Sequence, residues 1–403
     1  MECSISYDIG GNAMVNAYKN IKVEYLFSSP VGDIPLDEDA LARPFLISPA
    51  ETHPNLKLKH YFEALHRFIE RQEYRALSDV LSQNAPEKIV PQDIRRILIR
   101  SEKHGVLYHL ASVKVFFANY KVTFAVNTAV TESSKNWLNH EFEVIRSLNQ
   151  FTNLPYLPGE YFKNDVEIKI GNEDETMTMC LTEWFENYHE WHLSNDEKNG
   201  GQRIRIWDQL DGYRFASPEE SYDILREASK ILTLYYNTRD FRQIYPWHHA
   251  AGDFVVKPGS GKAQVKLTTA REYEPVIAFI KEADLNPTVA LTYFFLNLTI
   301  KMRLDKLDGT GDVAWAGRDA LPAVVDGFFE GLKIKEQEND YHLGQVKDLV
   351  TLFKGFNENE LQRLLSSMMD LFRGQDPGDF SVIQSNLESH AKELSSAIQN
   401  CPA

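Results

Sequence analysis

The residues best suited to chemistry lie together in one short segment, residues 245–256, which reads YPWHHAAGDFVV. In this segment, His248 and His249 precede Asp253. A histidine accepts a hydroxyl proton near neutral pH, because its pKa lies close to that pH. A carboxylate binds Mg²⁺ at least as well as an amide does. The segment therefore combines two potential bases with a potential metal ligand.

Two other interpretations of these three residues stay open. They could form a metal site with His189 or His192, but adjacent histidines usually point in different directions. The spacing also matches no metalloprotease signature. Alternatively, one of the two adjacent histidines packs under Trp247 and bonds to backbone groups. We favour this packing interpretation over a transition-metal site.

Two further motifs resemble known binding loops only in part. Residues 304–312, LDKLDGTGD, contain three aspartates as an EF-hand loop does, but they lack its glutamate at the twelfth position and its alternating register. Residues 259–262, GSGK, lack the first glycine of a phosphate-binding loop and the serine or threonine that follows its lysine. We therefore expect a polar loop between helices at the first motif and a hairpin turn at the second.

The composition predicts a globular protein with an acidic surface. Hydrophobic residues make up 43% of the chain and charged residues 25%, which is typical of a folded rather than a disordered protein. The formal net charge is −15. Such a balance argues against a dedicated partner made of nucleic acid or of anionic membrane. We expect neither partner.

Cysteine usage and hydropathy indicate a cytoplasmic protein. The three cysteines, Cys3, Cys180 and Cys401, lie far apart and without CxxC spacing, which excludes a disulfide framework and fits a reducing compartment. The N-terminus shows no basic segment followed by an apolar core, as a secretory signal would. The most apolar run, residues 289–302, is shorter than the ~20 residues of a membrane span, so we expect a buried helix there.

The pattern of apolar residues predicts helices before residue 103 and strands after it. Residues 1–54 contain five prolines and predict an extended arm. Residues 55–103 show helical spacing, including a second run at Ile94, Ile97 and Leu98. Valine-rich and aromatic-rich stretches then predict antiparallel strands over 106–111, 113–117 and 122–130.

A helix, two strands and a mostly helical remainder are expected after these strands. Ser133 or Ser134 can cap the helix, and alternation predicts strands over 166–170 and 177–181. Residues 187–216 suggest a polar linker. Ser217 and Glu220 form a capping box that begins a long helix, and a hairpin follows over 254–267.

From about residue 271 the pattern is helical to the end of the chain. One helix begins at Asn357, which forms a capping box with Glu360, and stops at Gly374.

This order of elements is similar to the protein-kinase-like fold, and especially to the aminoglycoside and choline phosphotransferases. That fold has a five-stranded N-lobe with one helix after the third strand, then a hinge, a long helix, a catalytic loop, a hairpin and a helical C-lobe. The resemblance covers about residues 104–345. It implies an α+β, two-lobed protein with an antiparallel five-stranded N-lobe over 104–186. A mostly helical C-lobe would occupy 187–403, and a helical N-terminal extension 1–103.

The resemblance also assigns candidate nucleotide-binding residues. Glu141 lies where the family has the glutamate that pairs with its nucleotide-binding lysine. Asn127 occupies the position of that lysine, and a neutral amide cannot supply its charge to the phosphates. Glu183 lies in the expected hinge, residues 181–186, where backbone groups recognise adenine. The glycine-rich loop of the family is absent.

The segment 245–256 falls where the family has its catalytic loop. Counted along that motif, His248 replaces the catalytic aspartate, and Asp253 replaces the asparagine that binds the metal ion. His249 is a second candidate catalytic residue. Thr269 occupies the position of the second metal-binding aspartate, and a threonine is a poor sole partner for a divalent cation.

Two functions follow from these matches and departures. The interpretation we favour is a pseudokinase-like binding or scaffold protein whose ligand is a nucleotide, another small molecule or a protein. The alternative is a divergent phosphotransferase that uses ATP and Mg²⁺ to phosphorylate a small-molecule or protein acceptor. In that case His248 acts as base or transition-state stabiliser and Asp253 as metal ligand. The sequence specifies no acceptor and no protein partner.

Overall fold

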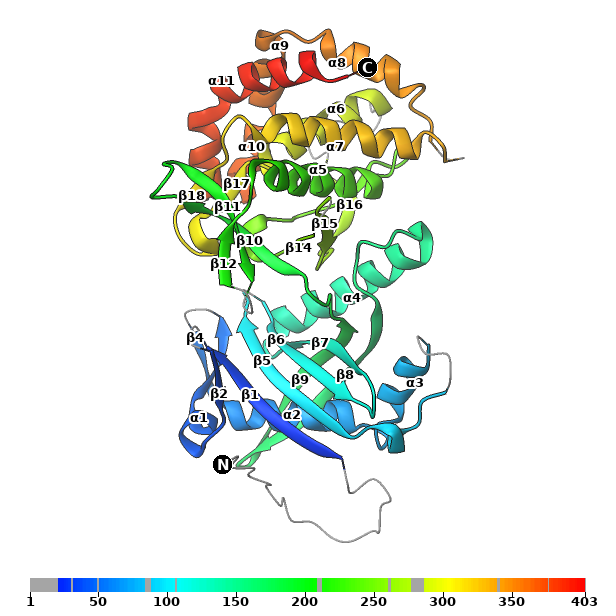
Figure 1. Ribbon diagram of the computed structural model, residues 1–403, viewed down its shortest axis with the longest axis vertical. Coiled ribbons are helices and arrows are strands. Elements are labelled where there is room, and N and C mark those ends of the chain that lie inside the picture. The colour runs from blue at the N-terminus through cyan, green and yellow to red at the C-terminus, as the bar shows by residue number, and fades with distance from the viewer. Residues whose placement is uncertain are drawn as a thin grey trace. The chain divides into compact units, whose positions relative to one another are not determined.

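The computed structural model describes residues 21–29, 32–48, 51–83, 88–105, 107–208, 212–259, 262–276, 286–338, 341–375 and 377–402 (Figure 1). The chain divides into two compact units. The first comprises Met1–Thr131 and Tyr161–Trp184, and the second comprises Glu132–Glu160 and Phe185–Ala403. Each unit is described by itself below.

The first unit is built on a mixed sheet of seven strands in the order β2-β1-β5-β6-β7-β9-β8. Strand β1 lies parallel to β5, whereas β5, β6, β7 and β9 each run antiparallel to the next. The strands are β1 Lys22–Ser29, β2 Gly32–Pro35, β5 Arg96–His104, β6 His109–Phe116, β7 Lys121–Ala129, β8 Glu160–Ile170 and β9 Glu173–Glu183. The remaining elements are α1 Glu38–Ala42, the pair β3 Pro44–Ser48 and β4 Glu51–Lys57, α2 Leu58–Glu70 and α3 Arg75–Gln83.

Helix α2 contributes apolar side chains to the hydrophobic core that it shares with the sheet of this unit. Its residues Tyr61, Leu65 and Phe68 are fully buried, at the helical spacing that the sequence predicts. They belong to one hydrophobic core with inward-facing residues of the sheet, among them Ile97 and Met179. The predicted helix near residue 58 is thereby confirmed.

Three sequence predictions for this unit are wrong. Residues 96–104 form a strand rather than a helix, because Ile97, Ile99 and Ser101 are buried at period two. The two strands predicted over 106–111 and 113–117 form one strand, β6. Residue 106 lies outside the described residues. The sheet has seven strands rather than five and is not wholly antiparallel.

The predicted segments also do not coincide with the two units. The boundary predicted between 103 and 104 falls inside β5. Much of the predicted extended arm, residues 1–20, lies outside the described residues, and residues 22–29 of that arm form strand β1 of the main sheet.

The second unit combines a five-stranded antiparallel sheet with a helical layer. The sheet order is β12-β11-β10-β14-β15. Its strands are β10 His189–Asn195, β11 Gln202–Asp208, β12 Gly212–Phe215, β14 Phe254–Lys257 and β15 Gln264–Leu267. Two small pairs are β13 Arg242–Ile244 with β16 Tyr273–Pro275, and β17 Leu304–Lys306 with β18 Val313–Trp315.

The helices of this unit follow the predicted caps in several places. They are α4 Glu132–Thr152, α5 Pro218–Tyr235, α6 Pro287–Lys301, α7 Ala320–Lys335, α8 Val346–Lys354, α9 Glu358–Ser367, α10 Met369–Gln375 and α11 Pro377–Asn400. The capping box of Ser217 and Glu220 at α5 is confirmed. The box of Asn357 and Glu360 at α9 is also confirmed. The hairpin β14–β15 is formed, although residues 260–261 of its predicted turn lie outside the described residues.

Other expectations for this unit are corrected. The predicted linker 187–216 contains the strands β10, β11 and β12, because its apolar and polar residues alternate. The aspartate-rich segment 304–312 contains β17 rather than only a loop between helices. Helix α4 begins at Glu132, so Ser133 and Ser134 lie inside it and not at its cap. The helix predicted to run to Gly374 is divided at Met368 into α9 and α10.

The apolar run 289–302 forms most of α6, which is buried almost throughout. Within the described part of the chain, none of the helices is both long and apolar enough to cross a membrane.

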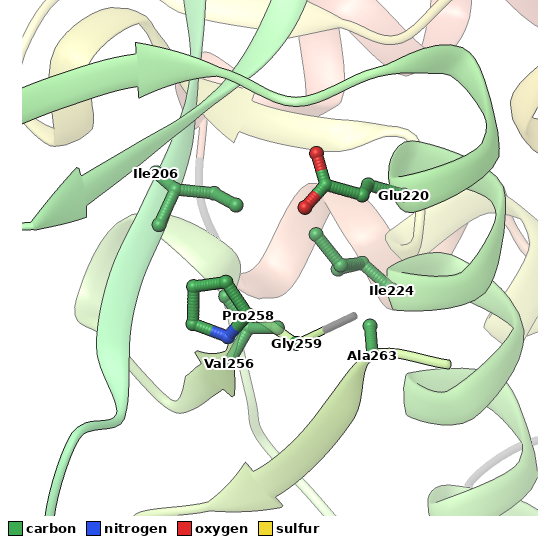
Figure 2. A pocket seen from close by; sticks show the side chains of 7 residues that line it. All are labelled: Ile206, Glu220, Ile224, Val256, Pro258, Gly259 and Ala263. Atoms are coloured by element: carbon green, nitrogen blue, oxygen red, sulfur yellow. The ribbon is translucent and has the colours of Figure 1, made fainter. Parts of the chain in front are cut away.

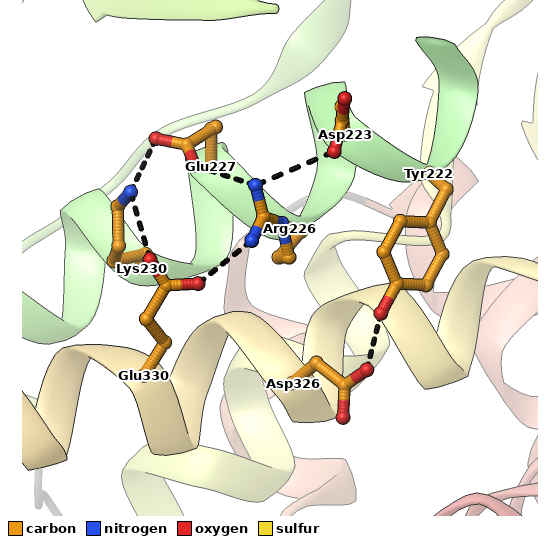
Figure 3. A network of polar contacts seen from close by, with 7 residues as sticks. All are labelled: Tyr222, Asp223, Arg226, Glu227, Lys230, Asp326 and Glu330. Carbon is orange, nitrogen blue, oxygen red and sulfur yellow. Dashed lines mark hydrogen bonds and ion pairs between the residues drawn. The ribbon is translucent and has the colours of Figure 1, made fainter. Parts of the chain in front are cut away.

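Helices α5 and α7 pack closely because two glycines of α7, Gly327 and Gly331, face α5. A Cβ atom added at Gly327 would lie 2.1 Å from the carbonyl oxygen of Arg226, and one at Gly331 would lie 2.8 Å from the Cβ of Thr233. Figure 3 shows the ionic contacts that flank this packing. Arg226 lies 2.9 Å from Glu330 of α7, and Lys230 lies 3.3 Å from the same carboxylate. The helix pair is therefore fixed by both steric fit and charge.

We predict that Gly327→Ala destabilises the protein by about 1–3 kcal/mol, because the new methyl group meets backbone that cannot move without separating α5 from α7. The measurement is the midpoint of urea unfolding followed by circular dichroism. Gly374→Ala in α10 is the control, since nothing lies near its added Cβ atom. An equal effect of the two substitutions would contradict the steric explanation.

Candidate functional site

The histidine-containing segment forms the connection between β13 and β14 in the second unit. His249–Ala251 is a single 3₁₀ turn, and the side chain of His248 caps its N-terminus. Gly252 ends the turn with a φ of 71°, a conformation that side-chain-bearing residues rarely adopt. Asp253 follows directly before β14, so its side chain is positioned by a tight turn on one side and a sheet strand on the other.

Asp253 forms the central polar contact of this site. Its side chain is 1% exposed, and Arg271 binds it in a bidentate manner, with nitrogen–oxygen distances of 2.6 and 2.7 Å. The backbone N–H of His248 donates to the same carboxylate at 2.8 Å. Both carboxylate oxygens are thus engaged by donors from the protein. The position that the family resemblance gives to a metal ligand already holds a guanidinium partner.

His248 is held by contacts at both ring nitrogens. Its Nδ1 accepts a hydrogen bond from the backbone N–H of Ala250 at 3.0 Å. Its Nε2 lies 3.4 Å from Oδ2 of Asp379, at the start of α11. Because Nδ1 is an acceptor, the Nε2 nitrogen carries the proton of a neutral ring and faces the carboxylate. In this state the ring has no lone pair available for a substrate hydroxyl.

Asp379 also binds Lys301, at 3.1 Å. Burial by itself would raise the pKa of Asp379, but the nearby His248 ring and the charge of Lys301 lower that pKa to about 2. The carboxylate is therefore charged at neutral pH and forms a buried link between α11, α6 and the histidine turn.

His249 points into an aromatic cluster rather than toward Asp253. Its ring centroid lies 4.4 Å from that of Trp191, 5.6 Å from Trp247 and 5.3 Å from Phe254. Among the described residues, neither ring nitrogen has a hydrogen-bond partner. Burial lowers the pKa of His249 to about 3, so the ring is neutral at physiological pH. The predicted packing of one histidine against Trp247 is present at His249, whereas the bond to a backbone group is made by its neighbour His248.

The remaining positions assigned by the resemblance are divided between the two units. In the second unit, the hydroxyl of Thr269 donates to the carboxylate of Glu141, and both residues are buried. In the first unit, Asn127 on β7 is opposite Cys180 on β9, and Glu183 is the exposed last residue of β9. The structure therefore brings Glu141 to Thr269 and His248 to Asp253. The binding roles predicted for Asn127, Glu141 and Glu183 stay predictions.

The two histidines of β10, His189 and His192, have acidic partners. His189 lies 3.4 Å from Asp208, and His192 lies 3.4 Å from Asp305. Burial by itself would lower the pKa of His192, but hydrogen bonds to Asp305 and Glu190 raise it overall. Among the described residues, no group of three or more histidine, cysteine and acidic side chains is arranged to hold a metal ion.

Figure 2 shows a small hollow between β11, β14 and the first turns of α5. Its lining is mostly apolar, and it leaves no space for a water molecule. The one carboxylate that lines it, Glu220, already binds Arg214 and the backbone of Ser217. In the described residues, the hollow is thus a packing feature between the sheet and α5.

Sequence reasoning missed the three residues that hold the site together. Arg271 lies only two positions after Thr269, and a charged residue just after a hairpin was a signal that could have been used. Asp379 and Lys301 gave no such signal, because they come from helices far from the histidine segment in sequence.

We predict that Arg271→Met destabilises the protein by about 3–5 kcal/mol, because it leaves the buried Asp253 carboxylate without its cation. The double variant Arg271→Met with Asp253→Leu should recover most of this loss, since no unpaired charge then remains. The measurement is the free energy of unfolding in urea.

The control for this pair is Arg373→Met, which removes an exposed ion pair with Asp370 and should cost less than about 1 kcal/mol. A double variant as unstable as the single one would show that the loss does not come from an uncompensated charge.

We also predict that stability falls as the pH is lowered from about 6.5 to about 3. The unfolded state binds a proton at His249 below its ordinary pKa of 6.5, whereas the folded state stays neutral until its pKa of about 3. Unfolding therefore takes up a proton in this window, and the slope is ~1.4 kcal/mol per pH unit for one histidine. His249→Leu should reduce the slope, measured by urea unfolding at several pH values.

His140→Leu, at an exposed position of α4, is the control for the pH series. If His249→Leu and His140→Leu have the same pH dependence, the buried ring does not contribute as proposed.

Comparison with known proteins adds no family to this description, because no protein-family model and no curated protein matches the chain.

Proposed function

We propose that the protein is a kinase-like binding or scaffold protein that does not transfer phosphoryl groups. The order of elements supports the kinase-like part of this proposal. Three strands, β5, β6 and β7, precede α4, and two strands, β8 and β9, follow it. The long helix α5, the histidine turn and the hairpin β14–β15 then occur in the order that the resemblance requires.

The bidentate contact between Arg271 and Asp253 carries the proposal that catalysis is absent. A divalent cation at Asp253 would have to displace the guanidinium, which is itself fixed by two hydrogen bonds to a buried carboxylate. It would also lie close to the positive charge of Arg271. A cation site needs oxygen ligands that are free to coordinate, and both oxygens of this carboxylate are already used.

Two further contacts support the same proposal. Glu141, which would pair with a nucleotide-binding lysine, is bonded instead to Thr269, the residue at the second metal position. His248, at the position of the catalytic base, is held between Ala250 and Asp379. Glu141, Thr269, His248 and Asp253 thus each have an internal partner in this protein.

We predict that ATP, ADP and GTP produce no Mg²⁺- or Mn²⁺-dependent rise in melting temperature and release no phosphate. A ligand present at ~100 times its Kd would stabilise the folded state by about 2.7 kcal/mol, which a thermal-shift measurement detects readily. Asp253→Asn is the test variant. Asp240→Asn is the matched control, because Asp240 is an exposed carboxylate that binds the side chain and the backbone N–H of Arg242.

A metal-dependent rise that is lost in Asp253→Asn but kept in Asp240→Asn would overturn the proposal. That result, together with phosphate release, would favour the divergent phosphotransferase with Asp253 as metal ligand.

A further inference from the structure

Strand β12 is the edge strand of the five-stranded sheet, with β11 as its neighbour. The N–H of Ala216, just after β12, donates to the carbonyl of Ile204 at 2.9 Å. Opposite residues of antiparallel strands are alternately joined and not joined by backbone hydrogen bonds. The next hydrogen-bonded pair after Ile204 and Ala216 is therefore Ile206 with Arg214. The backbone N–H and C=O groups of Tyr213 and Phe215 therefore point away from the sheet. Within the described ranges, the structure gives these groups no hydrogen bond.

An alternating row of aromatic rings and guanidinium groups lies on one face of β11 and β12. The rings of Trp207 and Tyr213 stack with centroids 5.4 Å apart and an interplanar angle of 8°. Arg205 lies over Tyr213 at 5.3 Å and near Phe215 at 5.9 Å, and Arg203 lies 5.3 Å from Phe215. Tyr213 is 49% exposed, so the row opens to solvent at the edge strand.

Arg205 differs from the neighbouring arginines in its partners. Arg203 is bound by Asp196 at 2.6 Å and by a backbone carbonyl at 2.8 Å. Arg214, on the opposite face, is bound to Glu220 in a bidentate manner. Within the part of the chain that the structure describes, the ionic contact of Arg205 is with the exposed Asp308 at 3.9 Å, beyond hydrogen-bonding distance. Its guanidinium is thus oriented over the rings of the edge strand while its N–H donors are available.

We propose that β12 binds an extended peptide segment that carries an acidic side chain. The segment adds a strand beside β12 and bonds to the outward backbone groups of Tyr213 and Phe215, as peptides do at other open sheet edges. Its carboxylate pairs with Arg205, whose planar fork suits a carboxylate and whose position over β12 brings it within reach of the added strand. Charge complementarity favours this acidic segment. The surface shares no residue with the histidine turn, so the inference stands independently of the proposed function.

The test uses a fluorescein-labelled heptapeptide of alternating threonine and valine with one central glutamate, and a second peptide with lysine in place of glutamate. Fluorescence anisotropy should detect saturable binding of the glutamate peptide below about 1 mM, and binding of the lysine peptide at least ~10-fold weaker. A peptide that is N-methylated along one edge should lose binding, because it cannot donate to the carbonyl groups of β12.

Two variants test the surface directly. Arg205→Gln should weaken binding of the glutamate peptide ~10-fold, as loss of a charge-assisted bond predicts. Tyr213→Pro removes one outward N–H without removing a bond to β11, and should also weaken binding. Arg214→Gln is the control on the opposite face and should leave binding unchanged. Circular dichroism checks that each variant is folded.

Two results would overturn the proposal. One is an absence of binding by the glutamate peptide, or binding that neither Arg205→Gln nor Tyr213→Pro changes. The other is self-association of the protein in analytical ultracentrifugation that Tyr213→Pro abolishes, because the edge would then be occupied by a second copy of the chain rather than by an acidic peptide.

Discussion

The buried contact between Asp253 and Arg271 is the interaction on which the second unit's central loop depends. A carboxylate that is 1% exposed requires a cation and further donors, and here Arg271 and the N–H of His248 supply them. Asp253 also fixes the hairpin, because its backbone carbonyl accepts a hydrogen bond from the N–H of Thr268. Removal of this charge pair would therefore affect the turn, β14 and the end of β15 together.

A second set of buried charges ties the C-terminal helix α11 to this loop. Asp379 contacts both His248 and Lys301, and further along the same helix Glu393 binds Arg303 at 2.7 Å. Arg303 is 3% exposed and lies over the ring of Trp315. Because buried ion pairs require specific partners, these contacts fix the position of α11 more narrowly than apolar packing would.

Local signals in the sequence predicted local structure, whereas contacts between residues far apart in the sequence were not predicted. Ser217 with Glu220 marked the start of α5, because a capping box involves neighbouring residues only. The strand β5 was missed because Ile97 and Leu98 also fit a helical pattern, and only pairing with β1 and β6 decides between the two. At the site, Asp253 and His248 could be identified as polar residues of a turn. The partner of His248, Asp379, could not, because no spacing rule connects it to that turn.

Internal contacts account for two residues, Thr269 and Arg271, in the segment where the chain departs from the pattern that the resemblance implies. If Thr269 were an aspartate, it would lie against the carboxylate of Glu141, and two buried carboxylates without a cation repel each other. A threonine hydroxyl instead donates to Glu141. Likewise, an arginine at position 271 is compatible with a buried Asp253 only where no metal ion competes for it. These residues thus form a mutually consistent set of internal contacts.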